Sequence, residues 1–467
     1  MTNERLRIRA DQLPLPPGPK PNWLAPLLLA GMGALFFTSY AWSNWLASQR
    51  VDIPSLYFAW ERHIPFIPWT ILPYWSIDFF YAGSFFLWST RAMLLTHAKR
   101  LLAAQLISVA CFVAFPLRFA FEHPPAHGWA GTLFTLLGGF DKPFNQAPSL
   151  HISLLLILWV AYAARARGGW RWLLHGWFAL IGVSVLTTYQ HHFIDVPSGW
   201  LAGCLCVFAF PLSEPTGRAL RCEQTRRIAR CYGIGAAAMA LLSLAIVRDT
   251  LAAGLLLAWT ALALACVAQQ YHAGRPDGLG KQADGTFPMA SWCLLAPYLC
   301  GAFFNARWWT RGQPGASRVA EGLWLGRFPT AAELRRTGAN AVLDLTAELP
   351  RLVRPSVYRC IPVLDLTVPS ESDLRVAVDT IHAWQADGRT VLVCCALGYS
   401  RSALVAAAWL ADQSPQPVAP SQLLAQLRAA RPGVTLGPRS MEGLAAYMST
   451  KRNQTEHRPL SGVDDAI

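Results

Sequence analysis

The sequence predicts a polytopic α-helical membrane domain, with a six-span core plus two or three added helices, followed by a soluble α/β domain with a central sheet flanked by helices. Three observations support this prediction. Of the 467 residues, 53% are hydrophobic and 20 are Trp, more than in an average soluble domain. Long apolar windows fill most of the chain up to residue 304. Near the C-terminal end, a β-branched run is followed by a turn and an apolar helical pattern.

Eight apolar windows are long enough, or nearly so, to cross about 30 Å of hydrocarbon. They are residues 24–45, 67–89, 101–121, 150–164, 172–188, 196–212, 232–247 and 251–269. A ninth window, 289–304, is short and contains Pro297, so it either crosses the bilayer or lies at its surface as an interfacial helix. Basic residues follow the second, fourth and sixth windows, the first set being Arg91, Lys99 and Arg100, and we expect these loops to be cytoplasmic.

The windows and the linkers between them predict five segments. Residues 1–22 form a cytoplasmic N-terminal segment, since they carry arginines but no cleavable signal pattern. Residues 23–213 form the six-span domain, and residues 214–310 form the added membrane helices and linker. Residues 316–450 form the soluble α/β domain, and residues 451–467 form a flexible tail.

The charge pattern indicates a membrane partner. The chain has 40 Lys and Arg against 27 Asp and Glu, a net charge of +13, and basic residues at a membrane surface attract anionic lipid headgroups. No aromatic and basic reading surface is evident, so we expect no nucleic-acid partner. The eleven Cys form neither a C-x-x-C pair nor a disulfide framework spacing. We therefore expect no metal site and no cofactor.

One C-terminal segment carries the residues of a phosphate-binding loop. Residues 391–395 fit a buried strand and residues 403–410 an apolar helix, so the turn between them would aim backbone N–H groups and the helix N-terminus at one point. The positive electrostatic potential of these groups favours the thiolate of Cys395, which can attack phosphorus. Arg401 offers a planar guanidinium that can bind two phosphate oxygens. Ser402 can stabilise the departing thiolate. The loop residues expected to bind the phosphate are Ala396, Leu397, Gly398, Tyr399 and Ser400.

This C-x5-R-S pattern resembles the active-site loop of the dual-specificity branch of the protein tyrosine phosphatase superfamily, over residues 319–447. The resemblance implies that Cys395 is the nucleophile. It also implies that Asp365, at the end of an Ile-Pro-Val-Leu-Asp segment, is the general acid that protonates the leaving alkoxide. Asp373 is a second candidate for the acid. The family usually has His directly before the nucleophile, where this chain has Cys394. The alternative interpretation is an ordinary strand, turn and helix with an incidental Cys and Arg.

A second constellation lies in the membrane part. His151 begins the fourth window in a Pro-Ser-Leu-His segment, and a segment from His191 to Asp195 closes the fifth, so an antiparallel helix pair would bring both to the outer membrane face. His191 and Asp195 are four residues apart and would share one side of a helix, where the carboxylate orients the imidazole. His191 would then attack phosphorus, and His151 would protonate the leaving group. The alternative is that these residues are interfacial and cap helices.

These segments resemble the type 2 phosphatidic acid phosphatase superfamily, over residues 24–212. The resemblance implies a phosphohistidine at His191, supported by Asp195, with His151 as the acid. The Pro-Ser-Leu-His and His-His-x-x-Asp variants look more like the sphingolipid phosphotransferase subgroup. Transfer of a headgroup is therefore as open as hydrolysis, since both proceed through a phosphohistidine.

The chain departs from that superfamily in the cations that bind phosphate. The first motif is altered, and in the third motif Val185 stands where the superfamily has an arginine. Arg118 and Lys142 are the candidates to anchor the phosphate instead. The alternative for Lys142 is a solvated charge in a loop.

Together the two parts resemble a bacterial fusion of a type 2 phosphatidic acid phosphatase domain with a dual-specificity phosphatase domain. The resemblance implies a multi-pass enzyme of the bacterial inner membrane, a phosphoric monoester hydrolase that acts on lipid or lipid-headgroup phosphates. Its partners would be membrane lipids and its phosphorylated substrate. We expect the membrane-domain site to face outside and the C-terminal domain to be cytoplasmic. The phosphate loop lacks extra basic side chains, which favours a substrate with one phosphate.

Two other interpretations stay open. In the first, the membrane domain is a noncatalytic anchor or a lipid headgroup phosphotransferase, and the C-terminal domain acts on phosphoproteins. In the second, a polytopic transporter carries a regulatory phosphatase domain. The substitution Asp195→Asn distinguishes a catalytic membrane domain from an anchor.

Overall fold

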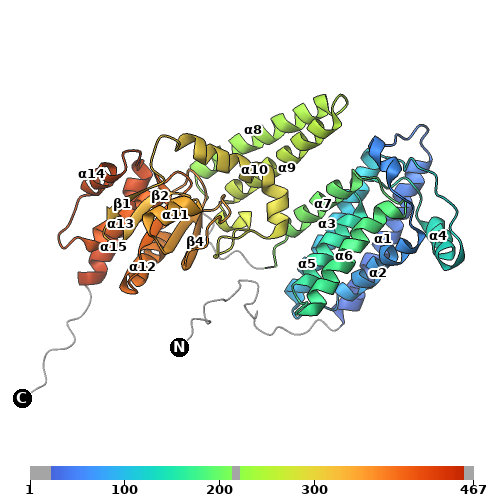
Figure 1. The fold of residues 1–467 in the computed structure, drawn as a ribbon, viewed down its shortest axis with the longest axis horizontal. Coiled ribbons are helices and arrows are strands. Elements are labelled where there is room, and N and C mark those ends of the chain that lie inside the picture. The colour runs from blue at the N-terminus through green and yellow to red at the C-terminus, as the bar shows by residue number, and fades with distance from the viewer. Residues whose placement is uncertain (1–22, 213–220, 457–467) are drawn as a thin grey trace, which may run out of the picture. The chain divides into compact units, whose positions relative to one another are not determined.

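The computed structural model describes residues 23–212 and 221–456 (Figure 1). Its contacts divide the chain into two compact units, Met1–Glu214 and Pro215–Ile467, and each unit has its own hydrophobic core. The predicted N-terminal segment lies outside the described residues, as does most of the predicted tail.

The first unit is a bundle of helices. It contains α1 (Leu24–Ser48), α2 (Ile71–Ser84), α3 (Arg91–Ala114), α4 (Gly128–Phe140), α5 (Leu150–Ala163), α6 (Gly169–Thr187) and α7 (Asp195–Ala209), with short 3₁₀ turns η1 (Ala59–His63) and η2 (Pro68–Thr70) before α2. α5 is apolar all round and lies in the core of the bundle. α7 approaches α5 closely at Gly199, where a Cβ would lie 2.5 Å from the Ser149 carbonyl oxygen. This approach brings the N-termini of the two helices together.

The start of α3 differs from the prediction. Thr90 caps this helix, because its hydroxyl accepts a hydrogen bond from a backbone N–H of the first turn, and α3 therefore begins at Arg91. Arg91, Lys99 and Arg100 were predicted in a cytoplasmic loop and are helical instead. Arg100 is buried, and its Nε donates to the Phe210 carbonyl at 2.8 Å. A hydropathy window misses such a start, since the basic residues lower its average.

The end of α3 and the presence of α4 were also not predicted. α3 ends at Ala114, well before residue 121, because Pro116 disfavours helical backbone in the residue before it. α4 has only 13 residues and contains several glycines, so it is too short to register as an apolar window.

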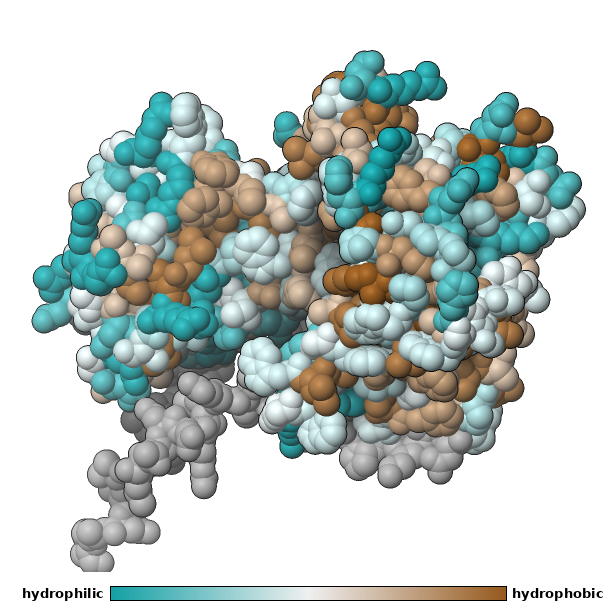
Figure 2. All heavy atoms as spheres, turned by 45° about the vertical axis from the view of Figure 1, so that its right-hand side comes forward, coloured by the Kyte–Doolittle hydropathy of each residue, from teal (hydrophilic) through white to brown (hydrophobic). Residues whose placement is uncertain are grey.

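Five helices of the described chain are long and apolar enough to cross a membrane. They are α1 and α3 in the first unit and three helices of the second, which indicates membrane association. Figure 2 shows hydrophobic side chains on the molecular surface. Among the described residues, Phe79 and Ile234 are large apolar side chains that are mostly exposed. The predicted six-span core is not confirmed. α5 has 14 residues and α7 has 15, and at about 1.5 Å per residue they cover about 21–23 Å of a bilayer core of about 30 Å.

The second unit begins with three long helices. α8 (Glu223–Ile246) and α9 (Leu251–Ala273) form a hairpin, and a 3₁₀ turn η3 (Pro276–Leu279) precedes α10 (Met289–Trp309). These three helices complete the set that can cross a membrane. α10 has 21 residues and continues through Pro297, so it is longer than the predicted ninth window.

The rest of the second unit is an α/β domain with a five-stranded mixed sheet in the order β1-β2-β5-β3-β4. The strands are β1 (Ala316–Ala320), β2 (Leu323–Arg327), β3 (Ala341–Thr346), β4 (Val357–Val363) and β5 (Val391–Cys395). β1 is antiparallel to β2, and the other pairs are parallel. The helices are α11 (Ala331–Thr337), α12 (Glu371–Ala386), α13 (Arg401–Gln413), α14 (Pro420–Ala430) and α15 (Pro438–Glu456), so the predicted tail starts helical.

Two apolar clusters cover the two faces of this sheet. One contains Cys395 together with side chains of α12, α13, α14 and α15, and the other contains Cys394 with side chains of α10 and α11. The prediction of a C-terminal α/β domain with a central sheet flanked by helices is confirmed. β5 lies in the middle of the sheet, so its carboxyl end opens at the centre of one edge.

The segment between α9 and α10 packs onto the α/β domain. Lys281 is buried and forms an ion pair with Asp344 of β3, and its Nζ also donates to the Thr346 carbonyl at 2.9 Å. The Cys360 N–H of β4 donates to the Ala283 carbonyl at 2.9 Å. The three long helices and the α/β domain therefore form one unit.

Candidate active site

The predicted phosphate loop joins β5 to α13. Cys395 is the last residue of β5, and Arg401 is the first residue of α13. The Cys395 sulfur accepts a hydrogen bond from the Gly398 N–H at 3.2 Å and another from the Ser402 hydroxyl at 3.2 Å. Two donors aimed at one buried sulfur stabilise a thiolate there, which is the nucleophilic form of cysteine.

The loop closes tightly because residue 398 is glycine. Gly398 has φ +75°, and a Cβ on it would lie 2.4 Å from the backbone carbonyl carbon of Gly326 in β2. Arg431 supports the outer side of the loop. Its buried guanidinium donates to the carbonyls of Gly398 at 3.0 Å and Leu397 at 3.1 Å. With these carbonyls turned toward Arg431, the loop is free to present N–H groups to a phosphate.

Arg401 is held by two carboxylates. Its Nη atoms donate to the two Glu348 oxygens at 2.6 and 3.0 Å, and Nη2 also donates to Asp365 Oδ1 at 2.8 Å. Burial alone would lower the pKa of the Arg401 guanidinium, but the charges of Glu348 and Asp365 outweigh it and hold the pKa above its ordinary value. The guanidinium is therefore charged and fixed in one orientation beside Cys395.

The structure places Asp365 beside Arg401, in the loop that follows β4. Its side chain is 36% exposed, so the carboxylate can give up its ion pair with Arg401 and contact a bound substrate while it stays at the site. A carboxyl group in this position lies next to the leaving oxygen of a phosphate bound at Arg401. The second candidate, Asp373, instead caps α12, where its carboxylate accepts from the Ser370 hydroxyl at 2.6 Å and the Ser370 N–H at 3.0 Å.

Cys394 faces away from the phosphate loop. Successive residues of a strand point to opposite faces, so Cys394 packs with Leu392 and Val342 in the cluster on the other side of the sheet from Cys395. Burial raises the pKa of the Cys394 thiol well above its ordinary value. Cys394 therefore adds no second nucleophile to the loop.

Two residues of this site were not predicted from the sequence, Glu348 and Arg431. Glu348 follows β3, and the carboxyl ends of parallel strands meet at one edge of a sheet, so its position in the chain offered a usable signal. Arg431 follows α14, and no local pattern relates it to the phosphate loop.

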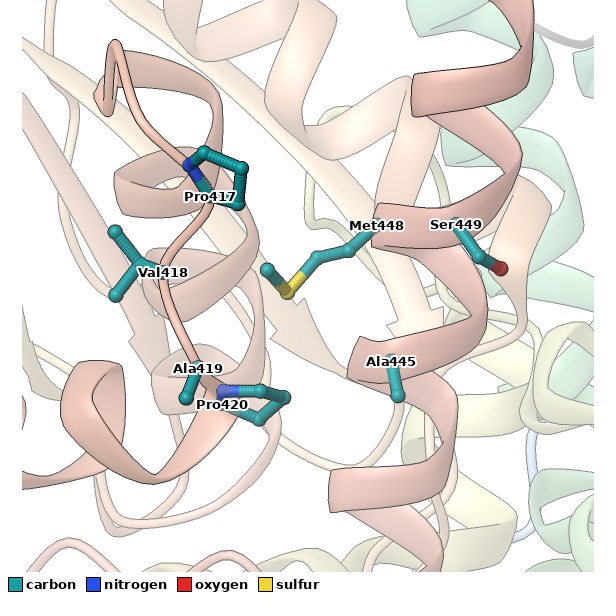
Figure 3. Close-up of a pocket in the computed structure, with 7 residues that line it drawn as sticks. All are labelled: Pro417, Val418, Ala419, Pro420, Ala445, Met448 and Ser449. Atoms are coloured by element: carbon teal, nitrogen blue, oxygen red, sulfur yellow. The ribbon is translucent and has the colours of Figure 1, made fainter.

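Two surface hollows of the described chain lie outside the phosphate loop. One, of about 370 Å³, is shown in Figure 3 and is lined by Pro417, Val418, Ala419, Pro420, Ala445, Met448 and Ser449. Its lining contains no charged side chain. The other, of about 250 Å³, lies beside the loop of Asp365 and is lined by Arg221, Cys222, Gln224, Thr225, Thr367, Val368 and Arg439.

The first unit brings His191 and Asp195 together. Nδ1 of His191 is 3.1 Å from Asp195 Oδ2, Nε2 is 3.0 Å from the Ser149 hydroxyl, and all three side chains are buried. The two residues do not share one side of a helix, contrary to the prediction. α7 begins only at Asp195, and His191 lies in the preceding turn. The carboxylate reaches back over the helix N-terminus, where it also accepts from the His192 N–H at 3.0 Å.

His151 lies in the first turn of α5, beside His191. Its ring stacks on Tyr74 with centroids 4.2 Å apart, and it interacts electrostatically with His191. Its Nε2 is buried without a hydrogen-bond partner among the described residues. A buried, unpaired imidazole nitrogen is costly, which is typical of a group kept for a substrate.

The adjacent histidine has a different environment. His192 Nε2 accepts from the Ala120 N–H at 2.9 Å, so Nδ1 carries the proton and donates to Glu61 Oε2 at 3.0 Å. The ring is stacked between Phe119 and Tyr57. Both nitrogens are bound within the protein, so His192 fastens the loops around the site. Glu61 was not predicted from the sequence.

The surroundings of His191 contain an acidic residue. Asp141 accepts a hydrogen bond from the Tyr40 hydroxyl at 2.8 Å and interacts electrostatically with His191. The side chains of Arg118 and Lys142 are exposed, and neither forms an ion pair with another described residue. Their role in phosphate binding stays a prediction.

Comparison with known proteins addresses the second unit. Residues 323–449 match the family model described as dual specificity phosphatase, catalytic domain, so the chain carries a C-terminal domain of this type. Phosphatidylglycerophosphate phosphatase PTPMT2 of Arabidopsis thaliana is 30% identical over 143 residues, which cover 28% of this chain and 59% of the relative. Human dual specificity protein phosphatase 15 is 32% identical over 96 residues, covering 20% of this chain and 32% of the relative. The chain thus spans less than two thirds of either relative.

Solved structures show similarity over a similar share of the chain. The crystal structure of PTPMT1 in complex with PI(5)P has 20% sequence identity and a TM-score of 0.26, covering 30% of this chain and 99% of that one. The crystal structure of Tk-PTP in the active form has 27% identity and a TM-score of 0.27, covering 29% and 97%. The fusion with a type 2 phosphatidic acid phosphatase domain stays a prediction.

Proposed function

We propose that this protein is a membrane phosphatase that hydrolyses phosphate monoesters of lipids or lipid headgroups through a phosphocysteine at Cys395. The observation that carries the proposal is the phosphate loop, in which Gly398 and Ser402 donate hydrogen bonds to the Cys395 sulfur beside a charged Arg401. The loop belongs to the same unit as α8, α9 and α10, each of which is long and apolar enough to cross a membrane.

The first chemical step follows from this arrangement. The phosphate of the substrate binds to the loop N–H groups and to Arg401, which releases Asp365 from the guanidinium, and the released carboxylate takes up a proton from solvent. The Cys395 thiolate attacks phosphorus, so that an S–P bond forms while the P–O bond to the alcohol breaks. Asp365 gives its proton to the departing oxygen, and the alcohol leaves.

The second step regenerates the enzyme. The Asp365 carboxylate removes a proton from water, whose oxygen attacks the phosphocysteine. The S–P bond breaks, and the electron pair returns to sulfur as a thiolate that the Ser402 hydroxyl stabilises at 3.2 Å. Inorganic phosphate then leaves the loop, and no cofactor is required.

Two observations favour lipid substrates over phosphoproteins. The α/β domain is packed against apolar helices, which would hold the site at a bilayer surface. The relative in Arabidopsis thaliana is named as a phosphatidylglycerophosphate phosphatase. The second candidate function, a membrane-anchored phosphatase of phosphoproteins, is favoured by the likeness to dual specificity protein phosphatase 15. The sequence of the loop favours a substrate with one phosphate.

The proposal is tested by phosphate release from a panel of lipid, aryl and phosphopeptide substrates by the full chain in detergent. We expect Cys395→Ser to abolish release from at least one lipid monoester, and we expect the wild type to prefer that monoester over phosphopeptides. A preference for phosphopeptides would establish the second candidate instead. Unchanged release in Cys395→Ser would overturn both.

For the first unit we propose a second site, in which His191 forms a phosphohistidine during hydrolysis or transfer of a lipid headgroup. The pairing of His191 with Asp195 at 3.1 Å supports it, because a carboxylate beside Nδ1 keeps the proton there and leaves the lone pair on Nε2. That lone pair, which accepts from the Ser149 hydroxyl at 3.0 Å, would attack phosphorus once a substrate displaces the hydroxyl. Its partners would be membrane lipids. We expect Asp195→Asn and His191→Ala to abolish one activity of the panel that Cys395→Ser leaves intact. If neither substitution changes any activity, the first unit is an anchor.

We further propose a bacterial inner-membrane location, with the His191 site outside and the Cys395 site in the cytoplasm. Basic residues near helix ends support the assignment, and a cytoplasmic thiol is protected from oxidation. Labelling of the exposed Cys222 with a membrane-impermeant reagent in intact cells tests the assignment. We expect labelling only after the cells are opened.

A further inference from the structure

We infer that α8 and α9 position the general acid of the Cys395 site, through Gln224 and Tyr271. The inference rests on the proposed function and concerns the loop of residues 364–367, which carries Asp365 between β4 and α12. This loop extends from the α/β domain, yet side chains from two apolar helices bind its backbone.

Two consecutive carbonyls of the loop are bound. Tyr271, in the last turn of α9, donates its hydroxyl to the Asp365 carbonyl at 3.1 Å. Gln224, in the first turn of α8, donates its side-chain amide to the Leu366 carbonyl. The other end of that amide accepts from Arg439 at 2.9 Å, which fixes its orientation. The two peptide groups that follow Asp365 are therefore tied to the helix hairpin.

The loop needs such support because its own conformation is unfavourable. Leu366 has φ +58°, in the left-handed region that residues with a side chain rarely adopt. Its side chain is 66% exposed, so packing contributes little to holding it. Within the loop, the Thr367 N–H donates to the Leu364 carbonyl at 3.2 Å and closes the turn. The bonds from Tyr271 and Gln224 are thus well placed to keep the strained conformation.

Tyr271 is itself held rigidly. It is 1% exposed, and its ring lies 5.3 Å from that of Tyr232 in α8, which lies 5.8 Å from the ring of Tyr298 in α10. All three tyrosines interact electrostatically with Asp365 and Glu348. On the other side, the hollow of about 250 Å³ beside Gln224 and Thr367 gives the loop room to move when the contacts are lost.

The chemical consequence depends on the leaving group. An alkoxide is a poor leaving group and needs the proton of Asp365, whereas a p-nitrophenolate leaves with little help. Loss of positioning should therefore slow alkyl phosphates selectively. The Cys395 thiolate, the loop N–H groups and Arg401 are untouched by the two side chains, so an aryl phosphate reports on them separately.

The test compares Tyr271→Phe and Gln224→Ala in the full chain in detergent, with an alkyl phosphate lipid and p-nitrophenyl phosphate as substrates. We expect kcat for the alkyl phosphate to fall about tenfold in each variant, with less than a twofold change for the aryl phosphate. In an Asp365→Asn background, Tyr271→Phe should cause no further loss. The matched control is Tyr447→Phe, which removes a hydroxyl bonded to Asp412 at 3.2 Å elsewhere in the domain.

Three outcomes are decisive. Equal losses on both substrates would mean that the two residues act through general stability, and the inference would be wrong. The inference would also be wrong if Tyr271→Phe and Gln224→Ala changed kcat no more than Tyr447→Phe does. That result would leave the proposed function intact, provided that Cys395→Ser is inactive. If Cys395→Ser is fully active on both substrates, the proposed function fails first, and the positioning role fails with it.

Discussion

Glu348 binds Arg401 through both carboxylate oxygens, at 2.6 and 3.0 Å, and each side chain is only 3% exposed. Glu348 follows β3, and Arg401 begins α13, so the pair joins two elements at the carboxyl edge of the sheet. A guanidinium fixed in this way requires no reorganisation when a phosphate arrives, which is how preorganised charges stabilise a transition state. The pair explains why the site depends on residues outside the C-x5-R-S segment.

Glu348→Gln should weaken phosphate binding. The amide keeps the shape of the side chain but turns an NH₂ group toward a guanidinium that has no acceptor to offer, so Arg401 loses its fixed orientation. We expect the inhibition constant of vanadate to rise by on the order of tenfold or more. The control is Glu371→Gln, which removes an exposed pair with Arg375 at 2.8 Å and should leave the constant unchanged. Equal values for wild type and Glu348→Gln would contradict the assigned role.

The two adjacent cysteines should differ in reactivity. The Cys394 thiol is buried on the far face of the sheet with a raised pKa, whereas the Cys395 sulfur faces the anion-binding loop. We expect iodoacetamide at neutral pH to alkylate Cys395 and spare Cys394, and vanadate to protect Cys395. Peptide mass spectrometry of the full chain checks the modified position. Alkylation of Cys394 at a comparable rate would mean that the face assignment is wrong.

Loss of the buried Lys281 charge should destabilise the second unit. Lys281 and Asp344 have fully buried side chains, and removing one member of such a pair leaves the other charge unpaired. We expect Lys281→Met to lower the free energy of unfolding by about 3–5 kcal/mol. The matched control is Arg230→Met, which breaks an exposed pair with Glu223 and should cost less than about 1 kcal/mol. Denaturant unfolding in detergent measures both, and similar losses would contradict the prediction.

The carboxylate of Glu333 should make stability depend on pH. Burial alone would raise the pKa of Glu333, but hydrogen bonds from Thr330, Arg327 and Arg307 outweigh it and lower the pKa to about 2. In the unfolded chain, the Glu333 carboxyl has an ordinary pKa of about 4.3, so it binds a proton at a higher pH than it does in the folded protein. The stabilisation is therefore complete above about pH 5 and is lost progressively toward pH 2.

Glu333→Gln removes this dependence. Between pH 6 and pH 3, we expect the thermal midpoint of the wild type to fall more than that of Glu333→Gln. The difference should correspond to about 1 kcal/mol of stability, a value that allows for solvent screening. Thermal unfolding at several pH values measures the difference. Parallel curves for the two proteins would show that the ion pairs of Glu333 contribute nothing.

The phosphate loop could be predicted from the sequence because its parts are contiguous. The strand, Cys395, the turn and Arg401 follow one another, and a strand-turn-helix can place them in essentially one way. Glu348 and Arg431 act on the same loop from other elements, and their contacts depend on strand order and on the path of the chain after α14. Tyr271 and Gln224 depend on the packing of apolar helices against the α/β domain, which hydropathy does not encode.

The first unit shows the same division between local and tertiary features. The pairing of His191 with Asp195 was predicted, since four residues separate them. The expectation of a shared helix was wrong because a turn precedes α7. The Asp195 carboxylate reaches the His191 imidazole from the N-terminus of α7 instead. The start of α3 was missed because the Thr90 cap determines it, and a hydropathy window does not register a cap.

The central claim is that Cys395 carries the phosphoryl group during turnover. Ser402 donates to the Cys395 sulfur at 3.2 Å, so Ser402→Ala should slow the departure of the thiolate and let the phosphoenzyme accumulate. The most direct measurement is mass spectrometry of Ser402→Ala quenched during turnover of a lipid phosphate. We predict one phosphoryl group on the peptide that contains Cys395. A phosphoryl group found on the His191 peptide alone, or on neither peptide, would contradict the account.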